Sequence, residues 1–209
     1  MLDAADRIVG QEGADALTTT RVAEAAGVSV GSLYQYLPDK DAIIGALANR
    51  YLAEFERLME QLVDEARGGS RDWGDPVETL IDAFAQRYRD RPGYRALWFG
   101  RDLSEELLTA DRLNKAILGR GVREILLALG LVRDDDDLEL AARTGVLVAD
   151  SLLQEAFRVD PDGDRQLIEE GKRILRLYLA DVREAGRTRP ATGARRRAAG
   201  PARRRRTRQ

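Results

Sequence analysis

The chain has 209 residues, of which 44% are hydrophobic and 33% charged, and its formal net charge is −2. Neither cysteine nor histidine is present, which excludes disulfides, thiolate metal sites and the catalytic pairs and triads built on these residues. No segment has the ~18 apolar residues of a membrane span, and no N-terminal stretch resembles a signal peptide. We therefore predict a soluble, cytoplasmic protein with no cofactor, no metal and no membrane partner.

Positive charge is concentrated at the C-terminal end. From Arg187 onward the sequence has ten arginines and no acidic residue. Residues 1–186 hold the other 24 of the 34 basic residues against all 36 acidic ones, so their net charge is −12. We expect residues 187–209 to form a disordered Arg-rich tail, which either adds nonspecific, salt-sensitive affinity for DNA or only keeps the chain in solution.

The chain opens with an apolar stripe at helical spacing. The stripe predicts a first helix that ends near Gly13, and it consists of Leu2, Ala5, Ile8 and Val9. This helix would brace the segment that follows it.

The segment from Thr18 to Lys40 contains two short predicted helices that meet at a glycine. Three threonines can cap the first helix, over 21–26, and Ser29 can cap the second, over 30–36. Gly27 lies where a chain leaving a helix commonly needs a positive φ. The apolar residues that would pack the two helices together are Val22, Ala23, Ala26, Val28, Leu33 and Tyr36. The pattern predicts a helix-turn-helix unit whose second helix enters the major groove, although a plain helical hairpin has similar spacing.

The outward positions of this unit suit DNA. Gln35 can form hydrogen bonds with a base edge, and a small apolar side chain can contact a thymine methyl group. Hydroxyl groups and a lysine beside the second helix suit phosphates. The candidate DNA-binding residues are Thr19, Thr20, Ser29, Val30, Gly31, Ser32, Tyr34, Gln35, Tyr36 and Lys40.

These residues resemble the DNA-binding signature of the tetracycline-repressor (TetR/AcrR) family of bacterial regulators. The matching positions, in about the first quarter of the chain, are Thr19, Ala23, Ala26–Ser29, Gly31–Tyr34, Tyr36 and Lys40, and Leu37 stands where many members carry Phe. The resemblance implies an all-α fold of about nine helices, with an N-terminal three-helix helix-turn-helix domain and a C-terminal helical effector-binding and dimerisation domain. It also implies a homodimeric, ligand-responsive repressor that binds a palindromic operator in double-stranded DNA. We expect the two domains to cover residues 1–45 and 46–186.

Further helices follow the helix-turn-helix unit. A long helix is predicted from Asp39 to the glycines at 68–69, and it is long enough to link the two domains. Asp75 followed by proline is a strong start for the next helix, which ends before Arg91. A short apolar segment covers 94–99, and later helices begin near Asp102 and cover about 138–157 and 166–183.

Aromatic residues gather on the helix that follows Asp75 and on the short segment after it. Aromatic side chains line ligand pockets, but they equally fill cores. The candidate effector-binding residues are Phe84, Tyr88, Tyr94, Trp98, Phe99, Asp150 and Gln154, with Arg95 and Arg101 as further polar contacts. The expected effector is a small hydrophobic or aromatic molecule.

The last two predicted helices carry small residues at regular steps. Ala141, Gly145 and Ala149 on one helix and Gly171 on the other would allow close approach of helices. Such contacts occur within one chain or in a four-helix interface between two copies. The family resemblance favours the homodimer interface.

Two other classes of function are alternatives to the regulator. A charge-driven, nucleoid-type DNA binder would use the Arg-rich tail, with the helix-turn-helix unit as a weak docking element. A helical enzyme would use carboxylates such as Asp150 and Glu155, but no acid pair, metal cluster or phosphate-binding loop stands out. We therefore predict that the chain is not an enzyme, and that tail deletion separates the two kinds of DNA binder.

Overall fold

The computed structural model describes residues 1–99, 104–135 and 137–188. Within these ranges the chain forms nine α-helices, one 3-10 turn and no strand, which confirms the all-α prediction. No helix in the described ranges is long and apolar enough to cross a membrane. Arg101 and the tail beyond residue 188 lie outside the described residues.

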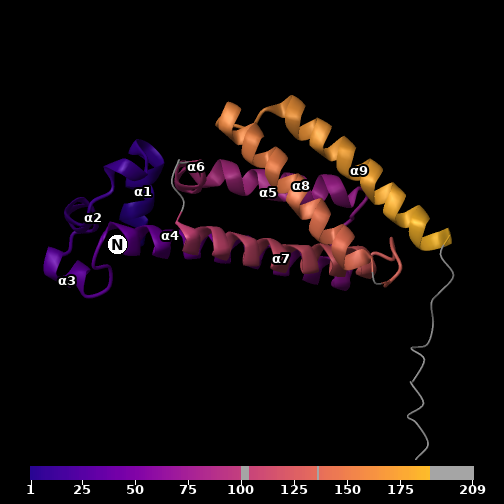
Figure 1. Ribbon diagram of the computed structural model, residues 1–209, viewed down its shortest axis with the longest axis horizontal. Coiled ribbons are helices and arrows are strands. Elements are labelled where there is room, and N and C mark those ends of the chain that lie inside the picture. Colours follow the sequence, from indigo (N-terminus) through magenta and orange to yellow (C-terminus); the bar gives the residue numbers. More distant parts are fainter. Residues whose placement is uncertain (100–103, 136, 189–209) are drawn as a thin grey trace, which may run out of the picture.

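Three short helices pack at one end of the molecule (Figure 1). They are α1 (Leu2–Glu12), α2 (Thr19–Ala26) and α3 (Val30–Tyr34), and the 3-10 turn η1 (Ala14–Ala16) joins the first two. Their shared core is fully buried and consists of Ala5, Val9, Leu17, Val22, Ala23 and Leu33. Apolar residues at helical spacing therefore fix this unit, as the sequence predicted.

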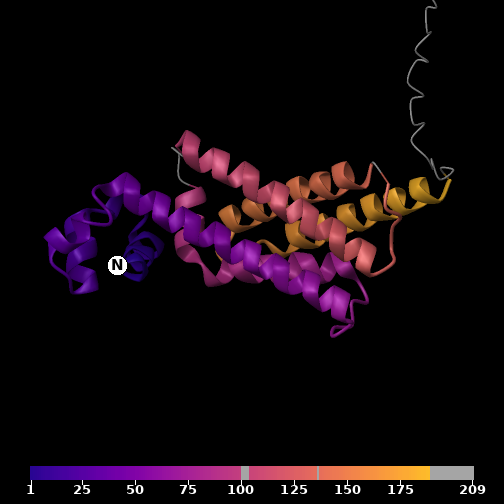
Figure 2. The same cartoon turned by 90° about the horizontal axis from the view of Figure 1, so that it is seen from below.

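The helix α4 (Lys40–Gly68) runs from this unit along the rest of the molecule (Figures 1 and 2). Asp39 caps it by accepting a hydrogen bond from the backbone N–H of Ala42 at 2.7 Å. The helix ends at Gly69, which has a left-handed conformation with φ 62°. Its buried side recurs at steps of three and four residues and packs mainly along α7.

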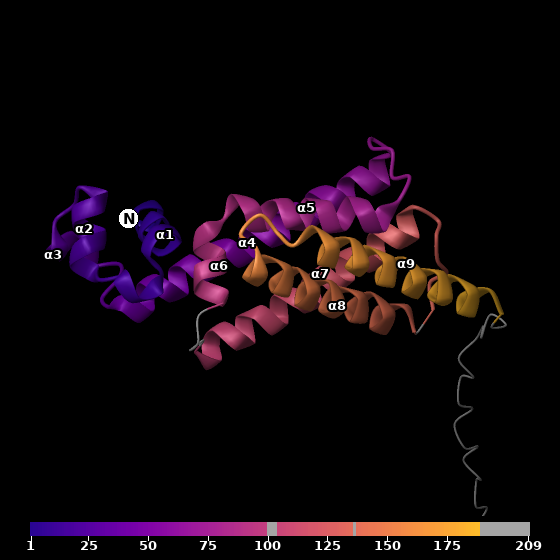
Figure 3. The ribbon, with the colours of Figure 1, turned by 90° about the horizontal axis from the view of Figure 1, so that it is seen from above.

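Five helices build the larger part of the fold. They are α5 (Pro76–Asp90), α6 (Pro92–Trp98), α7 (Glu105–Ala128), α8 (Leu138–Val159) and α9 (Arg165–Thr188). The helix α7 packs against α4 and α8, and α9 lies between α5 and α8 (Figure 3). Asp75 caps α5 as predicted, whereas α7 begins at Glu105 with Ser104 as its cap, later than the predicted start near Asp102.

One expectation about packing was wrong. The helix α3 ends at Tyr34, and Tyr36 is 72% exposed instead of packing against α2. Leu37 takes the buried position because it lies one full turn after Leu33, to whose carbonyl its N–H donates a hydrogen bond. On α8, the small residues Ala141 and Gly145 line a cavity within the domain, and their place at an interface between two copies stays a prediction.

Candidate DNA-binding surface and effector cavity

Local capping chemistry sets the turn between α2 and α3. The Thr18 hydroxyl accepts a hydrogen bond from the N–H of Arg21 at 3.2 Å, and the Ser29 hydroxyl accepts one from the N–H of Ser32 at 3.1 Å. Gly27 ends α2 with φ 66° and ψ 31°, a left-handed conformation that disfavours residues with a Cβ atom. The sequence therefore encodes both helix starts and the sharp turn between them.

The predicted DNA-binding residues lie at the surface of this unit. All of them are exposed except Thr19 and Lys40, which are half-buried. Tyr34 is 50% exposed, and its hydroxyl lies 3.3 Å from the Thr19 hydroxyl, so the two side chains share one hydrogen bond. The surface therefore offers hydroxyl groups from both α2 and α3.

The predicted DNA-binding residues carry little positive charge. Lys40 is their one basic member, and its amine lies 3.9 Å from a carboxylate oxygen of Asp15. Nearby on α2, the Arg21 guanidinium pairs with Glu12 at 2.6 Å. Since ion pairs at exposed positions contribute little to stability, these basic groups can exchange their carboxylate partners for phosphates.

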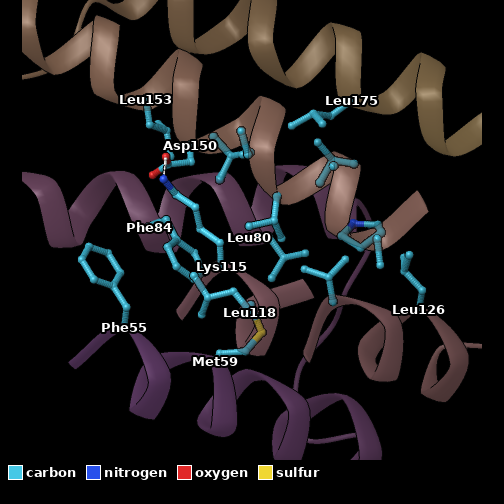
Figure 4. Close-up of a pocket in the computed structure, with 18 of the residues that line it drawn as sticks. Phe55, Met59, Leu80, Phe84, Lys115, Leu118, Leu126, Asp150, Leu153 and Leu175 are labelled. Carbon is cyan, nitrogen blue, oxygen red and sulfur yellow. Dashed lines mark ion pairs between the residues drawn. The ribbon is translucent and has the colours of Figure 1, made fainter. Parts of the chain in front are cut away.

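A cavity of about 130 Å³ lies among α4, α5, α6, α7, α8 and α9. Its walls are mostly apolar, and Figure 4 shows labelled side chains of α4, α5, α7, α8 and α9 converging on it. The labelled residues are Phe55, Met59, Leu80, Phe84, Lys115, Leu118, Leu126, Asp150, Leu153 and Leu175. This volume is close to that of an engineered apolar cavity of roughly 150 Å³ that binds benzene.

Four of the seven predicted effector-binding residues line this cavity, namely Phe84, Tyr88, Tyr94 and Asp150. The other three do not line it. The Trp98 indole stacks on Tyr94 at 4.5 Å and donates a hydrogen bond to Asp111 at 3.3 Å. Gln154 donates to Asp150 at 2.8 Å, and Phe99 lies under the Arg158 guanidinium at 5.1 Å. Trp98 and Gln154 therefore position lining residues.

The polar residues that α7 brings to the cavity were not predicted from the sequence. Lys115 lies 2.5 Å from Asp111 and 2.8 Å from Asp150, and Asn114 lines the cavity beside it. The signal was present in the sequence, because Asp111 and Asn114 interrupt the stripe that runs from Leu107 to Leu118. In the described ranges, no group of three potential metal ligands is positioned to hold an ion.

The two tyrosines beside this polar group are neutral phenols. Burial raises the pKa of Tyr88 and Tyr94 well above the ordinary value of a phenol, and the Asp150 carboxylate adds to the effect. The Tyr88 hydroxyl donates a hydrogen bond to Asp150 at 3.2 Å. Asp150 is therefore held from three directions, by Tyr88, Lys115 and Gln154.

A close helix contact connects the cavity helices to the DNA-binding unit. A Cβ atom on Gly10 of α1 would lie 3.2 Å from the backbone nitrogen of Gly93 on α6. Asp6 of α1 accepts hydrogen bonds from the Tyr51 hydroxyl and, at 2.5 Å, from Arg50, both on α4. Because Gly93 is next to Tyr94, which lines the cavity, α6 contacts both the cavity and α1.

Comparison with known proteins places both parts of the chain. Residues 1–47 match the family described as "Bacterial regulatory proteins, tetR family", and residues 71–182 match the family described as "Tetracyclin repressor-like, C-terminal domain". A TetR-family transcriptional regulator from Streptomyces coelicolor is 33% identical, with a TM-score of 0.62 over 87% of this chain and 96% of that one.

Two further proteins are similar to this chain. The HTH-type transcriptional repressor Rv1474c from Mycobacterium tuberculosis is 29% identical over 131 residues, which are 59% of this chain and 68% of that protein. The structure of SmeT in complex with triclosan is 21% identical with a TM-score of 0.61, over 91% of this chain and 93% of that one. At that identity the second comparison supports a shared fold alone.

Proposed function

Because the chain belongs to the tetR family of bacterial regulatory proteins, we propose that it represses transcription as a homodimer on a near-palindromic operator, and that a small ligand changes its affinity for DNA. Membership of the family confirms the resemblance seen between Thr19 and Lys40. It makes the chain a DNA-binding transcriptional regulator of the repressor type and not an enzyme. The capped α2–turn–α3 unit, with its exposed outer surface, carries the proposal.

In this proposal α3 reads the major groove. Gln35 directly follows α3 and is exposed, so its amide can form two hydrogen bonds with one base edge. The exposed hydroxyls of Tyr34 and Tyr36 and the amine of Lys40 would contact phosphates, which position the protein without reading sequence. Val30 and Gly31 keep the start of α3 narrow enough to approach the bases.

A second copy would double the number of bases read. The helices α8 and α9 both leave large apolar side chains exposed: Leu140 at 59%, Leu147 at 45%, Ile174 at 39% and Leu177 at 60%. Burying them against the same residues of a second copy would give a two-fold interface. The two α3 helices would then reach major grooves about one helical turn apart, ~34–36 Å, or a multiple of that distance.

Ligand binding would act on DNA affinity through α6. A ligand shifts the balance between two conformations only if it binds one of them more tightly. Tyr94 on α6 lines the cavity, and the adjacent Gly93 contacts α1 of the DNA-binding unit. A ligand that displaces α6 would therefore press on α1 and change the orientation of α3, which in a dimer alters the spacing of the two recognition helices.

Fluorescence anisotropy with two DNAs tests the proposal. Labelled DNA from upstream of the protein's own gene is compared with a scrambled duplex at two salt concentrations, using the full chain and a chain that ends at residue 186. The proposal expects a preference for the upstream DNA that survives tail removal, with specific affinities of about 10⁻⁸–10⁻¹¹ M. Equal affinity for both DNAs, lost at high salt or without the tail, would instead support the charge-driven binder.

A further inference from the structure

The polar end of the cavity holds more negative than positive charge. Among the described residues that line the cavity, the acidic and basic side chains are Asp111, Lys115 and Asp150, and the remaining ionisable side chains are tyrosines. Burial acts to lower the pKa of Lys115, but the carboxylates of Asp150 and Asp111 outweigh it and raise that pKa, so the amine is protonated. One lysine between two aspartates leaves a net charge of −1.

Lys115 already forms ion pairs with both of these carboxylates. Its amine lies 2.5 Å from Asp111 and 2.8 Å from Asp150, and its side chain is only 18% exposed. Figure 4 shows Lys115 extending across the cavity toward Asp150. An anionic ligand would have to separate Lys115 from a carboxylate, which would leave that carboxylate without its cation in largely apolar surroundings.

Aromatic rings form the wall next to this polar end. Phe55 and Phe84 stack with ring centroids 5.6 Å apart, and the rings of Tyr88 and Tyr94 meet edge-on at 5.2 Å. Both ring pairs line the cavity, so they supply an apolar wall against which the body of a ligand can pack. The wall therefore selects the apolar body of a ligand, and the excess carboxylate selects its head group.

We propose that the cavity selects an organic cation whose apolar body is about the size of one ring and whose ammonium group binds beside Asp111 and Asp150. The ammonium group would bring the polar end to neutrality while leaving both Lys115 ion pairs in place. The apolar body would lie between Phe84 and the leucines of α5 and α7. This inference rests on the proposed role of the cavity as the effector site and narrows that role to one class of ligand.

Three probes with the same phenylpropyl body test the head group. The full chain, without DNA, is titrated by calorimetry with 3-phenylpropylamine, 3-phenylpropanol and 3-phenylpropionate. The amine should bind about tenfold more tightly than the alcohol, and the propionate more weakly than the alcohol. This order of affinities is expected because the polar end has one carboxylate more than it has cations. Tightest binding of the propionate, equal binding of all three, or no binding of any of them would overturn the proposal.

Substitutions with opposite effects on the cavity charge extend the test. Asp150→Asn brings the net charge to zero and should remove the preference for the amine. Lys115→Met removes the cation that both carboxylates share, so an ammonium ligand can take its place and the preference for the amine should strengthen, which a merely damaged cavity would not do. Glu139→Gln, at an exposed position on α8, makes the same change in total charge as Asp150→Asn and should leave the order unchanged. Thermal melts of each variant verify that it is folded.

The experiments distinguish an error in the proposed ligand class from an error in the proposed function. If the protein prefers one DNA sequence but binds none of the probes, the ligand class is refuted and the DNA-binding part stands. If the probes bind in the expected order but no DNA sequence is preferred, the cavity assignment stands and the repressor proposal fails.

Discussion

Gly93→Ala tests the contact between α6 and α1. A Cβ atom at this position would come closer than 3.0 Å to the Asp6 carboxylate and to the Tyr51 hydroxyl, and within 3.2 Å of the Asp6 backbone oxygen. Rotation of the side chains cannot relieve this overlap, because Tyr51 is 1% exposed and Asp6 is also bound by Arg50 at 2.5 Å. The helix α6 must therefore move away from α1, by about 1 Å if normal contact distances are restored.

The substitution should lower the free energy of unfolding because it overpacks the contact between α6 and α1. Forcing an extra methyl group into a packed contact costs about 1–3 kcal/mol, and the better helix propensity of alanine returns about 0.5–1 kcal/mol. For a chain of this size, each kcal/mol changes the melting temperature by about 2–4 °C. The net cost is therefore about 0–2.5 kcal/mol, so Gly93→Ala should melt below the parent chain, by about 4 °C at the midpoint of these ranges and by up to about 10 °C at their limit.

Circular dichroism melts at one fixed protein concentration provide the measurement, since dimerisation makes the melting temperature concentration-dependent. Gly45→Ala on α4 is the matched control, because a Cβ atom there meets nothing within 4 Å. It should raise the melting temperature slightly through helix propensity. If Gly93→Ala is as stable as Gly45→Ala, α6 does not contact α1 as closely as described, and the route from cavity to DNA-binding unit loses its support.

Three further predictions concern the interface, the recognition helix and a helix cap. Leu177→Glu should yield a monomer in sedimentation analysis and lose operator binding. The control Leu113→Glu, at a 63% exposed position on α7, should remain a dimer. If Leu177→Glu is still a dimer, the proposed interface is refuted. Gln35→Ala should relax base preference in anisotropy titrations, while Tyr36→Ala should weaken binding to all DNA alike. If Gln35→Ala loses equal affinity for specific and for scrambled DNA, its base-reading role is contradicted. Asp75→Ala removes the cap of α5 and the ion pair between Asp75 and α9. We expect the free energy of unfolding, measured with urea, to fall by about 1–2 kcal/mol. An unchanged urea midpoint would contradict the stabilising role of this cap.

Helix starts could be predicted from the sequence because capping is local. Thr18, Ser29 and Asp75 each accept a backbone N–H two or three residues later, so a short stretch of sequence contains the whole interaction. The end of α3 could not be predicted as well. Whether Tyr36 or Leu37 is buried depends on how the chain leaves Leu33, and both are apolar enough to fill the position.

The cavity was only partly predictable, for a physical reason. Periodicity identifies the apolar side of a helix, but it does not distinguish a side that lines a cavity from one that meets another helix. The spacing of Ala141 and Gly145 therefore predicts close helix packing, but it does not indicate that both residues line the cavity. Lys115 was overlooked because its partner Asp150 lies on a different helix, and only tertiary packing brings the two together at 2.8 Å.

Selection of binding sites from a random pool of duplex DNA is a direct test of sequence-specific recognition by a dimer, because it does not depend on which genes the protein regulates. The full chain is used at moderate salt, and the enriched sequences are then tested individually with Gln35→Ala. We expect enrichment of an inverted repeat whose half-sites are about one helical turn, or a multiple of it, apart. The preference for this repeat should weaken in the variant. A pool that stays random, or a single unpaired half-site, would contradict sequence-specific recognition by a dimer.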